Sequence, residues 1–184
     1  MKNNIFLEGS NIYISPLSKN DISDEYVSWL NDEEICKENS HATFPNTKKK
    51  TADYIKSLEN SKEEIAFAIK WKKNNKHIGN IAIKNIDRIN RSAELAIIIG
   101  DKNYWSKGVG SDAYRMLIDY GFKTLNLNRI SSGQTVSNTG MIMVCEKMGM
   151  KKEGILREVL FKKGEYVNAV IYSIILKDYK KINR

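Results

Sequence analysis

The chain has 184 residues, with 30 Lys and Arg against 22 Asp and Glu, so its net charge is +8. No run of roughly 18 apolar residues is present, which excludes a membrane-spanning helix. The first residues lack the apolar stretch of a signal peptide, and Cys36 and Cys145 are too few for a metal or disulfide framework. We therefore expect one cytoplasmic domain over residues 1–184, with reduced thiols and no metal.

The positive charge is spread along the chain in short clusters, such as Lys48-Lys49-Lys50 and Lys162-Lys163. Neither a nucleic-acid motif nor a basic and aromatic stripe accompanies them. Nucleic acid is therefore a minor alternative as a partner, and it predicts salt-sensitive binding to random duplex. A basic surface also suits a polyanionic cofactor or an acidic substrate.

The first half of the chain combines short strands with two amphipathic helices. In chain order we predict a strand at 12–14, a helix at 22–30, a polar loop at 38–47, a helix at 51–60, and strands at 65–71 and 77–84. Tyr26, Trp29 and Leu30 share one face of the first helix. His77 follows a turn at 73–76 and is expected to be solvated.

The second half carries the longest helix and a terminal hairpin. We predict a strand at 91–100, a helix at 114–125, a strand at 129–136, a helix at 138–148 capped by Gly149, and a hairpin with strands at 154–161 and 167–176. This order predicts an α+β (mixed α/β) fold, in which helices flank a central mixed sheet that is mostly antiparallel.

A loop with two glycines, Lys107-Gly108-Val109-Gly110-Ser111, connects the 91–100 strand to the helix that follows. Backbone N–H groups at a helix N-terminus lack intrahelical partners and attract anions, and glycines let a phosphate approach the backbone. The loop fits neither the P-loop, because its lysine precedes the glycines, nor the dinucleotide fingerprint, whose third glycine is Ala113 here. It predicts a pyrophosphate cradle, with a simple turn as the alternative.

Taken together, these features resemble the GCN5-related N-acetyltransferase superfamily over nearly the whole chain. The cofactor loop of that family is Gln/Arg-x-x-Gly-x-Gly/Ala, and Trp105 replaces its first residue here. A later motif of the family appears as Asn138-Thr139-Gly140-Met141 followed by Glu146-Lys147-Met148-Gly149-Met150. Two further motifs resemble the branch of the ribosomal-protein-alanine acetyltransferases: Tyr104-Trp105-Ser106-Lys107-Gly108 and Gly164-Glu165-Tyr166.

The resemblance implies acetyl-CoA as the co-substrate. It implies that the backbone amides from Lys107 to Ser111 (Lys107, Gly108, Val109, Gly110 and Ser111) hold the pyrophosphate. It also implies that the 93–100 and 129–136 strands splay beside the pantetheine arm. The Ile98 amide would then stabilise the oxyanion, and Asn138 would contact the pantetheine or the tetrahedral intermediate.

An amine must lose a proton before it attacks the thioester, and Glu94 is the candidate base. The resemblance implies this role, because a glutamate base stands at that place in histone-acetylating members. The alternatives are that Glu94 anchors the substrate ammonium or pairs with Arg91 or Lys84.

A tyrosine that protonates the leaving thiolate is common in the family, and Cys145 stands in its place. Cys145 is either a proton donor or a small buried hydrophobe. Ser137, Tyr166 and Tyr172 are other possible donors, and thiolate release without a protein acid is a further option.

The resemblance implies a primary amine as acceptor: a protein N-terminal α-amine, or a small amine such as a polyamine or a nucleotide-linked amino sugar. An acyl-CoA-binding module without transferase activity is the alternative class. Tyr26 and Trp29 are expected in the core, with the wall of an acceptor pocket as the alternative. His41 is a weak candidate for substrate contact, and a homodimer that pairs the C-terminal hairpins is possible.

Overall fold

The computed structural model describes residues 4–182. The strands are β1 (Leu7–Glu8), β2 (Ile12–Pro16), β3 (Ile65–Trp71), β4 (Lys76–Asp87), β5 (Ser92–Ile99), β6 (Arg129–Thr135), β7 (Lys151–Lys162) and β8 (Glu165–Ile175). The α-helices are α1 (Asp24–Trp29), α2 (Lys48–Leu58), α3 (Val109–Lys123), α4 (Thr139–Lys147) and α5 (Leu176–Ile182). Residues 1–3 and 183–184 of the expected domain lie outside the described part.

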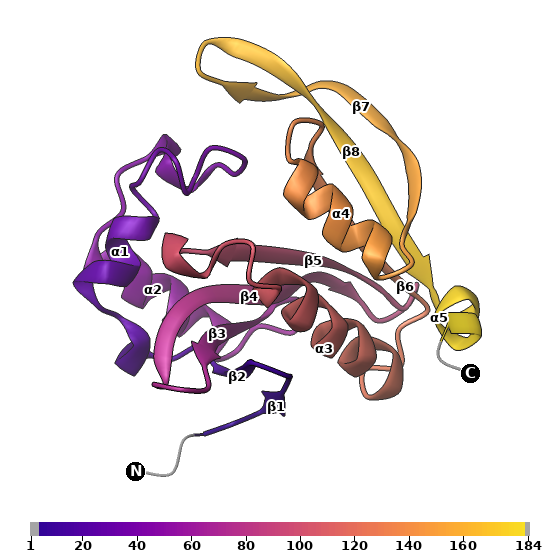
Figure 1. Cartoon of the computed structure of the whole chain (residues 1–184), viewed down its shortest axis with the longest axis horizontal. Helices are drawn as coiled ribbons and strands as arrows, with labels where there is room; N and C mark the ends of the chain where they lie inside the picture. Colours follow the sequence, from indigo (N-terminus) through magenta and orange to yellow (C-terminus); the bar gives the residue numbers. More distant parts are fainter. Residues whose placement is uncertain (1–3, 183–184) are drawn as a thin grey trace.

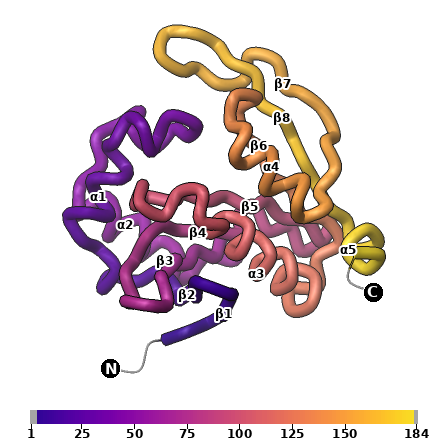
Figure 2. The backbone as a smooth tube through the Cα atoms, in the orientation of Figure 1, coloured from indigo at the N-terminus to yellow at the C-terminus, as the bar shows by residue number. Residues whose placement is uncertain are grey.

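These strands form a single sheet in the order β1-β2-β3-β4-β5-β6-β8-β7, and every neighbouring pair is antiparallel except β5 and β6. The expected mixed, mostly antiparallel sheet with flanking helices is therefore confirmed (Figure 1). The β7–β8 hairpin extends beyond the other strands (Figure 2).

The sheet separates two apolar clusters. One cluster joins α1 and α2 to alanines of β3 and β4 and to Ile98 of β5. The other, larger cluster joins α3, α4 and α5 to the opposite face of the strands, with Leu117 of α3 and Ile130 of β6 fully buried. Helices α1 and α2 thus cover one face of the sheet, and α3, α4 and α5 cover the other. The two faces are connected only where neighbouring strands separate.

Strands β5 and β6 separate after three residue pairs. Ser92, Ala93 and Glu94 pair with Arg129, Ile130 and Ser131. Beyond Ser131, β6 continues to pair with β8 on its other side, while β5 continues to pair with β4. The expected splay is confirmed, and it leaves one edge of each strand facing a gap in the middle of the sheet.

Capping residues explain where the predicted helices differ from the observed ones. The first helix begins at Asp24 because the Ser23 hydroxyl accepts the Tyr26 N–H, and α2 begins at Lys48 because Thr47 caps it in the same way. Strand β1 and helix α5 were not predicted. The sequence of α5 continues an apolar strand without a break, so its start was assigned to that strand.

The core expectation for the first helix is confirmed. Tyr26 and Trp29 are 3% and 4% exposed, and a Cβ at Gly100 would collide with the Trp29 ring. The expectation for His77 was wrong, because its ring lies against both aromatic rings, with centroids 5.2 Å from Tyr26 and 5.1 Å from Trp29. Its Nε2 contacts the carbonyl of Gly79 at 3.0 Å. Among residues 4–182, no helix is long and apolar enough to cross a membrane.

We predict that His77 makes the fold sensitive to mild acid. Burial lowers the pKa of His77 below its usual 6.5, so the neutral ring stabilises the fold above that pH, and this stabilisation is lost as the pH falls below it. The loss is at most about 1.4 kcal/mol per pH unit. Urea unfolding between pH 8 and pH 5 should show a shallower pH dependence for His77→Gln. Parallel pH profiles for the two proteins would contradict the prediction.

Candidate active site

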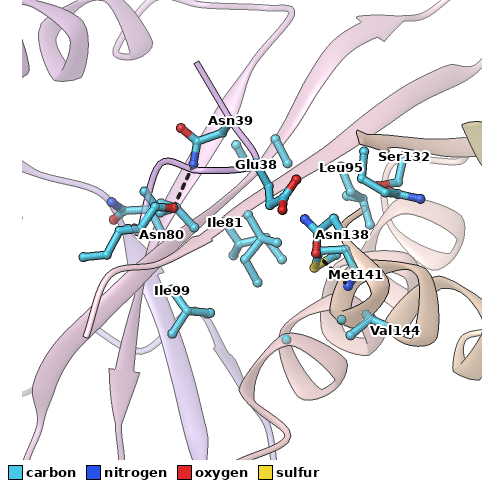
Figure 3. Close-up of a pocket in the computed structure, with 18 of the residues that line it drawn as sticks. Glu38, Asn39, Asn80, Ile81, Leu95, Ile99, Ser132, Asn138, Met141 and Val144 are labelled. Carbon is cyan, nitrogen blue, oxygen red and sulfur yellow. Dashed lines mark hydrogen bonds between the residues drawn. The ribbon is translucent and has the colours of Figure 1, made fainter. Parts of the chain in front are cut away.

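A cleft of about 1210 Å³ opens where β5 and β6 separate. Its walls come from β4, β5 and β6, from the first turns of α3 and α4, and from the segment that joins α1 to α2. Figure 3 shows side chains from both halves of the molecule converging on it, with Glu38 on one side and Asn138, Met141 and Val144 on the other.

One end of the cleft is the glycine loop at the start of α3. Gly108 has a φ of 77°, in the left-handed region, and its carbonyl accepts the first helical bond, from the Asp112 N–H. The amides of Val109, Gly110 and Ser111 therefore form the open first turn of a 15-residue helix. Nothing lies within 4 Å of a Cβ built on Gly108. This bare helix start with open space before it fits a pyrophosphate.

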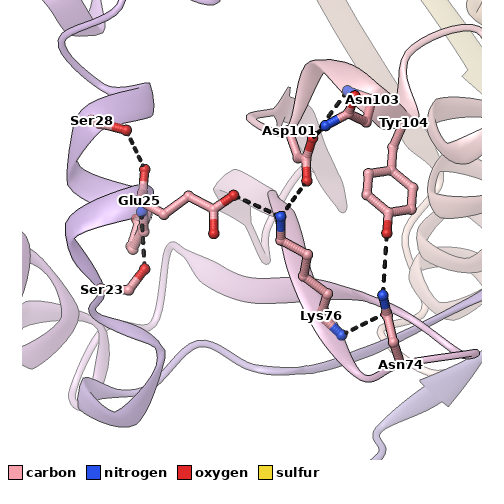
Figure 4. Close-up of polar contacts among 9 residues, drawn as sticks. Ser23, Glu25, Ser28, Asn74, Lys76, Asp101, Asn103 and Tyr104 are labelled. Carbon is pink, nitrogen blue, oxygen red and sulfur yellow. Dashed lines mark hydrogen bonds and ion pairs between the residues drawn. The ribbon is translucent and has the colours of Figure 1, made fainter.

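The loop before this helix is fastened at three points. The Trp105 indole N–H donates to the Ile99 carbonyl at 2.8 Å, so Trp105 anchors the loop to the end of β5. The Asp101 carboxylate accepts the Asn103 N–H at 3.0 Å and the Lys76 ammonium at 2.7 Å, and that ammonium also contacts Glu25 of α1 (Figure 4). These contacts fix the position of the loop and leave the amides of Val109, Gly110 and Ser111 open.

Lys107 lies beside this helix start. Its ammonium is 5.4 Å from the centre of the Tyr104 ring, and the side chain is exposed. Lys107 and the open amides of α3 thus gather positive charge at the place where the sequence predicted an anion.

The backbone N–H and C=O groups of successive residues in β5 point alternately toward β4 and toward β6. Three contacts show which residues point to which side. The Arg91 carbonyl accepts the Arg129 N–H of β6, the Gly100 N–H donates to Ile78 of β4, and the Ile99 carbonyl accepts Trp105. Odd-numbered residues therefore face β6 and the gap, while even-numbered residues face β4.

This alternation corrects the assignment of Ile98. Ile98 pairs with Asn80 of β4, and its N–H points toward that strand. The N–H groups of Ile97 and Ile99 face the gap instead, so they are the better candidates for contact with a thioester oxygen. Side-chain patterns could not reveal this, since it depends on the register with β4.

Asn138 forms the N-cap of α4, where its side-chain oxygen accepts the Met141 N–H at 3.1 Å. The residue also lines the cleft. Its cap role occupies the oxygen, so the amide nitrogen is the group that remains for a ligand.

Glu94 lines the cleft on the face of the sheet that α1 and α2 cover. Its Oε2 accepts the Asn85 side-chain N–H at 3.1 Å, and its other oxygen approaches Gly133 of β6. Among the described ion pairs none involves Glu94, so the alternative pairing with Arg91 or Lys84 is absent from residues 4–182. The carboxylate therefore lines the cleft with the Asn85 amide as its hydrogen-bond donor.

Four glutamates line the cleft, Glu34, Glu38, Glu64 and Glu94, and the sequence predicted only Glu94. Glu38 lies in the segment between α1 and α2 and accepts hydrogen bonds from the hydroxyls of Thr135 and, at 3.1 Å, Ser137. Thr135 and Ser137 follow the gap on β6, so Glu38 crosses the cleft to reach them. No motif surrounds this glutamate, and only the fold brings it to the same cleft as Glu94.

Cys145 is fully buried and does not line the cleft. Burial raises the pKa of its thiol to about 11, and the thiol contacts Gln134 at 3.8 Å. These facts argue against Cys145 as the proton donor and favour the reading of a small buried residue.

The other suggested proton donors differ in position. Tyr166 is 67% exposed on the hairpin, and Tyr172 donates to Glu146 at 3.0 Å. Neither lines the cleft, whereas Ser137 and His41 do. Within residues 4–182, no group of three acidic, histidine or cysteine side chains is arranged to hold a metal.

Comparison with known proteins agrees with this geometry. Residues 11–151 match the model of the acetyltransferase (GNAT) domain family. The uncharacterized N-acetyltransferase p20 of Bacillus licheniformis is 36% identical over 113 residues, 61% of this chain and 63% of that protein, so this match spans less than two thirds of the relative. The probable N-acetyltransferase YjcK of Bacillus subtilis is 29% identical over 94% of this chain and 98% of its own.

A solved structure of similar fold is the spermidine N-acetyltransferase of Vibrio cholerae in complex with CoA and spermine. It superposes with a TM-score of 0.84 at 23% identity and covers 92% of this chain and 98% of its own. The likeness confirms the fold of the described chain.

We predict that Gly108→Ala weakens CoA binding beyond its effect on stability. Gly164→Ala is the matched control, because Gly164 also has a positive φ, of 89°, and open space around its Cβ, but lies on the distant hairpin. Both variants should lose about 1–2 kcal/mol of unfolding free energy. Only Gly108→Ala should raise the Kd for CoA in calorimetry, on the order of tenfold or more. Equal CoA affinity in the two variants would show that the loop does not touch the ligand.

Proposed function

Because this chain belongs to the acetyltransferase (GNAT) family and is an acetyl-CoA-dependent N-acetyltransferase, we propose that its acceptor is a small polycationic amine held by Glu38 and Glu94. The observation that carries this proposal is that Glu38 and Glu94 line one cleft, in which Glu34 is paired with Lys102 and Glu64 accepts the Tyr54 hydroxyl. The whole chain would act as one domain in this reaction.

The two carboxylates suit an acceptor with more than one amino group. Glu94 comes from β5, and Glu38, labelled in Figure 3, comes from the segment between α1 and α2. The side chain of Glu38 is 23% exposed; its ion pair among the described residues is Lys37 at 3.9 Å, and the charge of Lys162 also acts on it. Partly buried carboxylates with weak or absent ion pairs attract ammonium groups locally, although the net charge of the chain is +8.

The proposed reaction is a direct transfer. Glu94 takes a proton from the ammonium that lies nearest the gap, and the neutral amine attacks the thioester carbon of acetyl-CoA. The N–H group of Ile97 or Ile99 stabilises the negative charge on the carbonyl oxygen. The C–S bond then breaks, the acetylated amine loses its second proton, and CoA leaves as a thiol or thiolate.

Two other acceptor classes compete with this proposal. The motifs that resemble the ribosomal-protein-alanine acetyltransferases support a protein N-terminal α-amine, and a nucleotide-linked amino sugar is the third class. The segment between α1 and α2 is held across the cleft by the hydrogen bonds of Glu38. This segment narrows the access, which favours a small, extended acceptor over a folded protein. An acyl-CoA-binding module without turnover is the remaining, less favoured alternative.

We predict turnover with spermidine or a similar polyamine, and little with N-terminal peptides or nucleotide-linked amino sugars. The measurement is release of free CoA from acetyl-CoA in the presence of each acceptor, with mass spectrometry of the product. Turnover confined to peptides or amino sugars would overturn the proposed acceptor. Binding of acetyl-CoA with no turnover on any of them would favour the binding module.

We also predict that Glu94→Gln and Glu38→Gln affect different kinetic constants. Loss of the base should lower kcat by roughly 10²-fold. Loss of a charged ligand for the distant ammonium should raise KM on the order of tenfold, with kcat nearly unchanged. Glu33→Gln, in the same segment but outside the cleft, is the control. If Glu94→Gln keeps full kcat, Glu94 is not the base.

A further inference from the structure

A cluster of four polar side chains lies beneath the cleft, between β6 and the helices α3 and α4. The Tyr114 hydroxyl of α3 is 2.9 Å from the Ser132 hydroxyl of β6. Ser132 donates to the Gln134 Oε1 at 3.2 Å, and the Cys145 thiol of α4 approaches the same oxygen at 3.8 Å. Each member of the cluster is at least nine-tenths buried.

The hydrogen bonds of this cluster end at one acceptor, the Gln134 Oε1. Tyr114 donates to Ser132, and Ser132 and Cys145 both donate to Gln134 Oε1, which leaves the Gln134 Nε2 as a buried donor without a partner. An unpaired buried donor is costly, so native proteins rarely keep one without a reason. Gln134 is 6% exposed and is one of the residues that line the cleft.

Gln134 lies beside the gap, on the same face of the sheet as the open amides of α3, so an acyl-CoA bound there can reach it. Gln134 lies three residues beyond Ser131, the last residue of β6 that pairs with β5, so it stands beside the gap. Its side chain is on the face that α3 and α4 cover, which is also the face of the open α3 amides. An acyl-CoA held at α3 therefore extends its arm past Gln134, whereas the acceptor carboxylates lie on the opposite face.

We propose that Gln134 Nε2 donates a hydrogen bond to the arm of acetyl-CoA, whose amide and thioester carbonyls are suitable acceptors. The terminal torsion of a glutamine side chain is broad, so a small rotation turns Nε2 toward the cleft. Cys145 does not line the cleft, and the hydroxyls of Tyr114 and Ser132, which do line it, are engaged within the cluster, so Gln134 Nε2 is the donor that remains. The proposal rests on the use of acetyl-CoA and is independent of the acceptor.

Gln134 is the sole glutamine of the sequence, which allows a direct test in the unaltered protein. Labelling the side-chain nitrogen of glutamine with ¹⁵N gives a single pair of glutamine amide protons in a correlation spectrum. Titration with CoA should move one proton of this pair downfield and protect it from solvent exchange. A pair that does not move at saturating CoA would overturn the proposal.

Affinity measurements give the second test. Gln134→Met keeps the side-chain length but lacks the donor, and it should raise the Kd for acetyl-CoA about 5- to 100-fold, the cost of leaving a buried polar group unpaired. Ser173→Ala is the control, because Ser173 is equally buried on β8 but lies outside the cleft. Calorimetry without any acceptor separates this result from the acceptor proposal. An affinity within twofold of the unaltered protein, or an equal loss in both variants, would contradict the role of Gln134.

Discussion

The separation of β5 from β6 is the constraint on which the rest of this molecule depends. A central sheet satisfies its backbone groups by pairing every strand on both sides. Here the pairing stops after three residues, because β6 follows β8 while β5 stays with β4. The unpaired edges form the walls of the cleft and supply donors and acceptors at fixed spacing. Ile97 and Ile99 can serve a ligand only because their own strand leaves them without a neighbour.

The gap also connects two faces that are otherwise separate. The face under α3 and α4 offers the open helix start, the Asn138 amide and the buried cluster around Gln134. The face under α1 and α2 offers the carboxylates Glu38 and Glu94. The open α3 amides suit an anionic donor, and the two carboxylates are the groups proposed for a cationic acceptor on a face that Lys50 and Lys84 also line. A reaction between the two is then confined to the place where the strands part.

Cys145 stands where the family commonly has a tyrosine, and the space beside β6 holds a buried polar cluster. Tyr114 joins this cluster from α3, and the Cys145 thiol joins it from α4. Burial holds the pKa of the Cys145 thiol near 11, so it stays a neutral hydrogen-bond donor at physiological pH. Cys145 therefore serves the buried cluster and does not line the cleft.

Local chemistry was sufficient for part of this structure. The strand periodicity, the lysine and glycines before α3, and Asn138 before α4 act within one turn or one strand, and the sequence alone predicted the mixed sheet, the glycine loop that opens α3 and the strand that carries Glu94. The direction of the Ile98 amide, the packing of His77 against two aromatic rings, the burial of Cys145, and the position of Glu38 in the same cleft as Glu94 depended on register and on contacts between segments far apart in the chain. Such contacts are set by packing and strand pairing, which no local pattern encodes, so only the tertiary structure decided them.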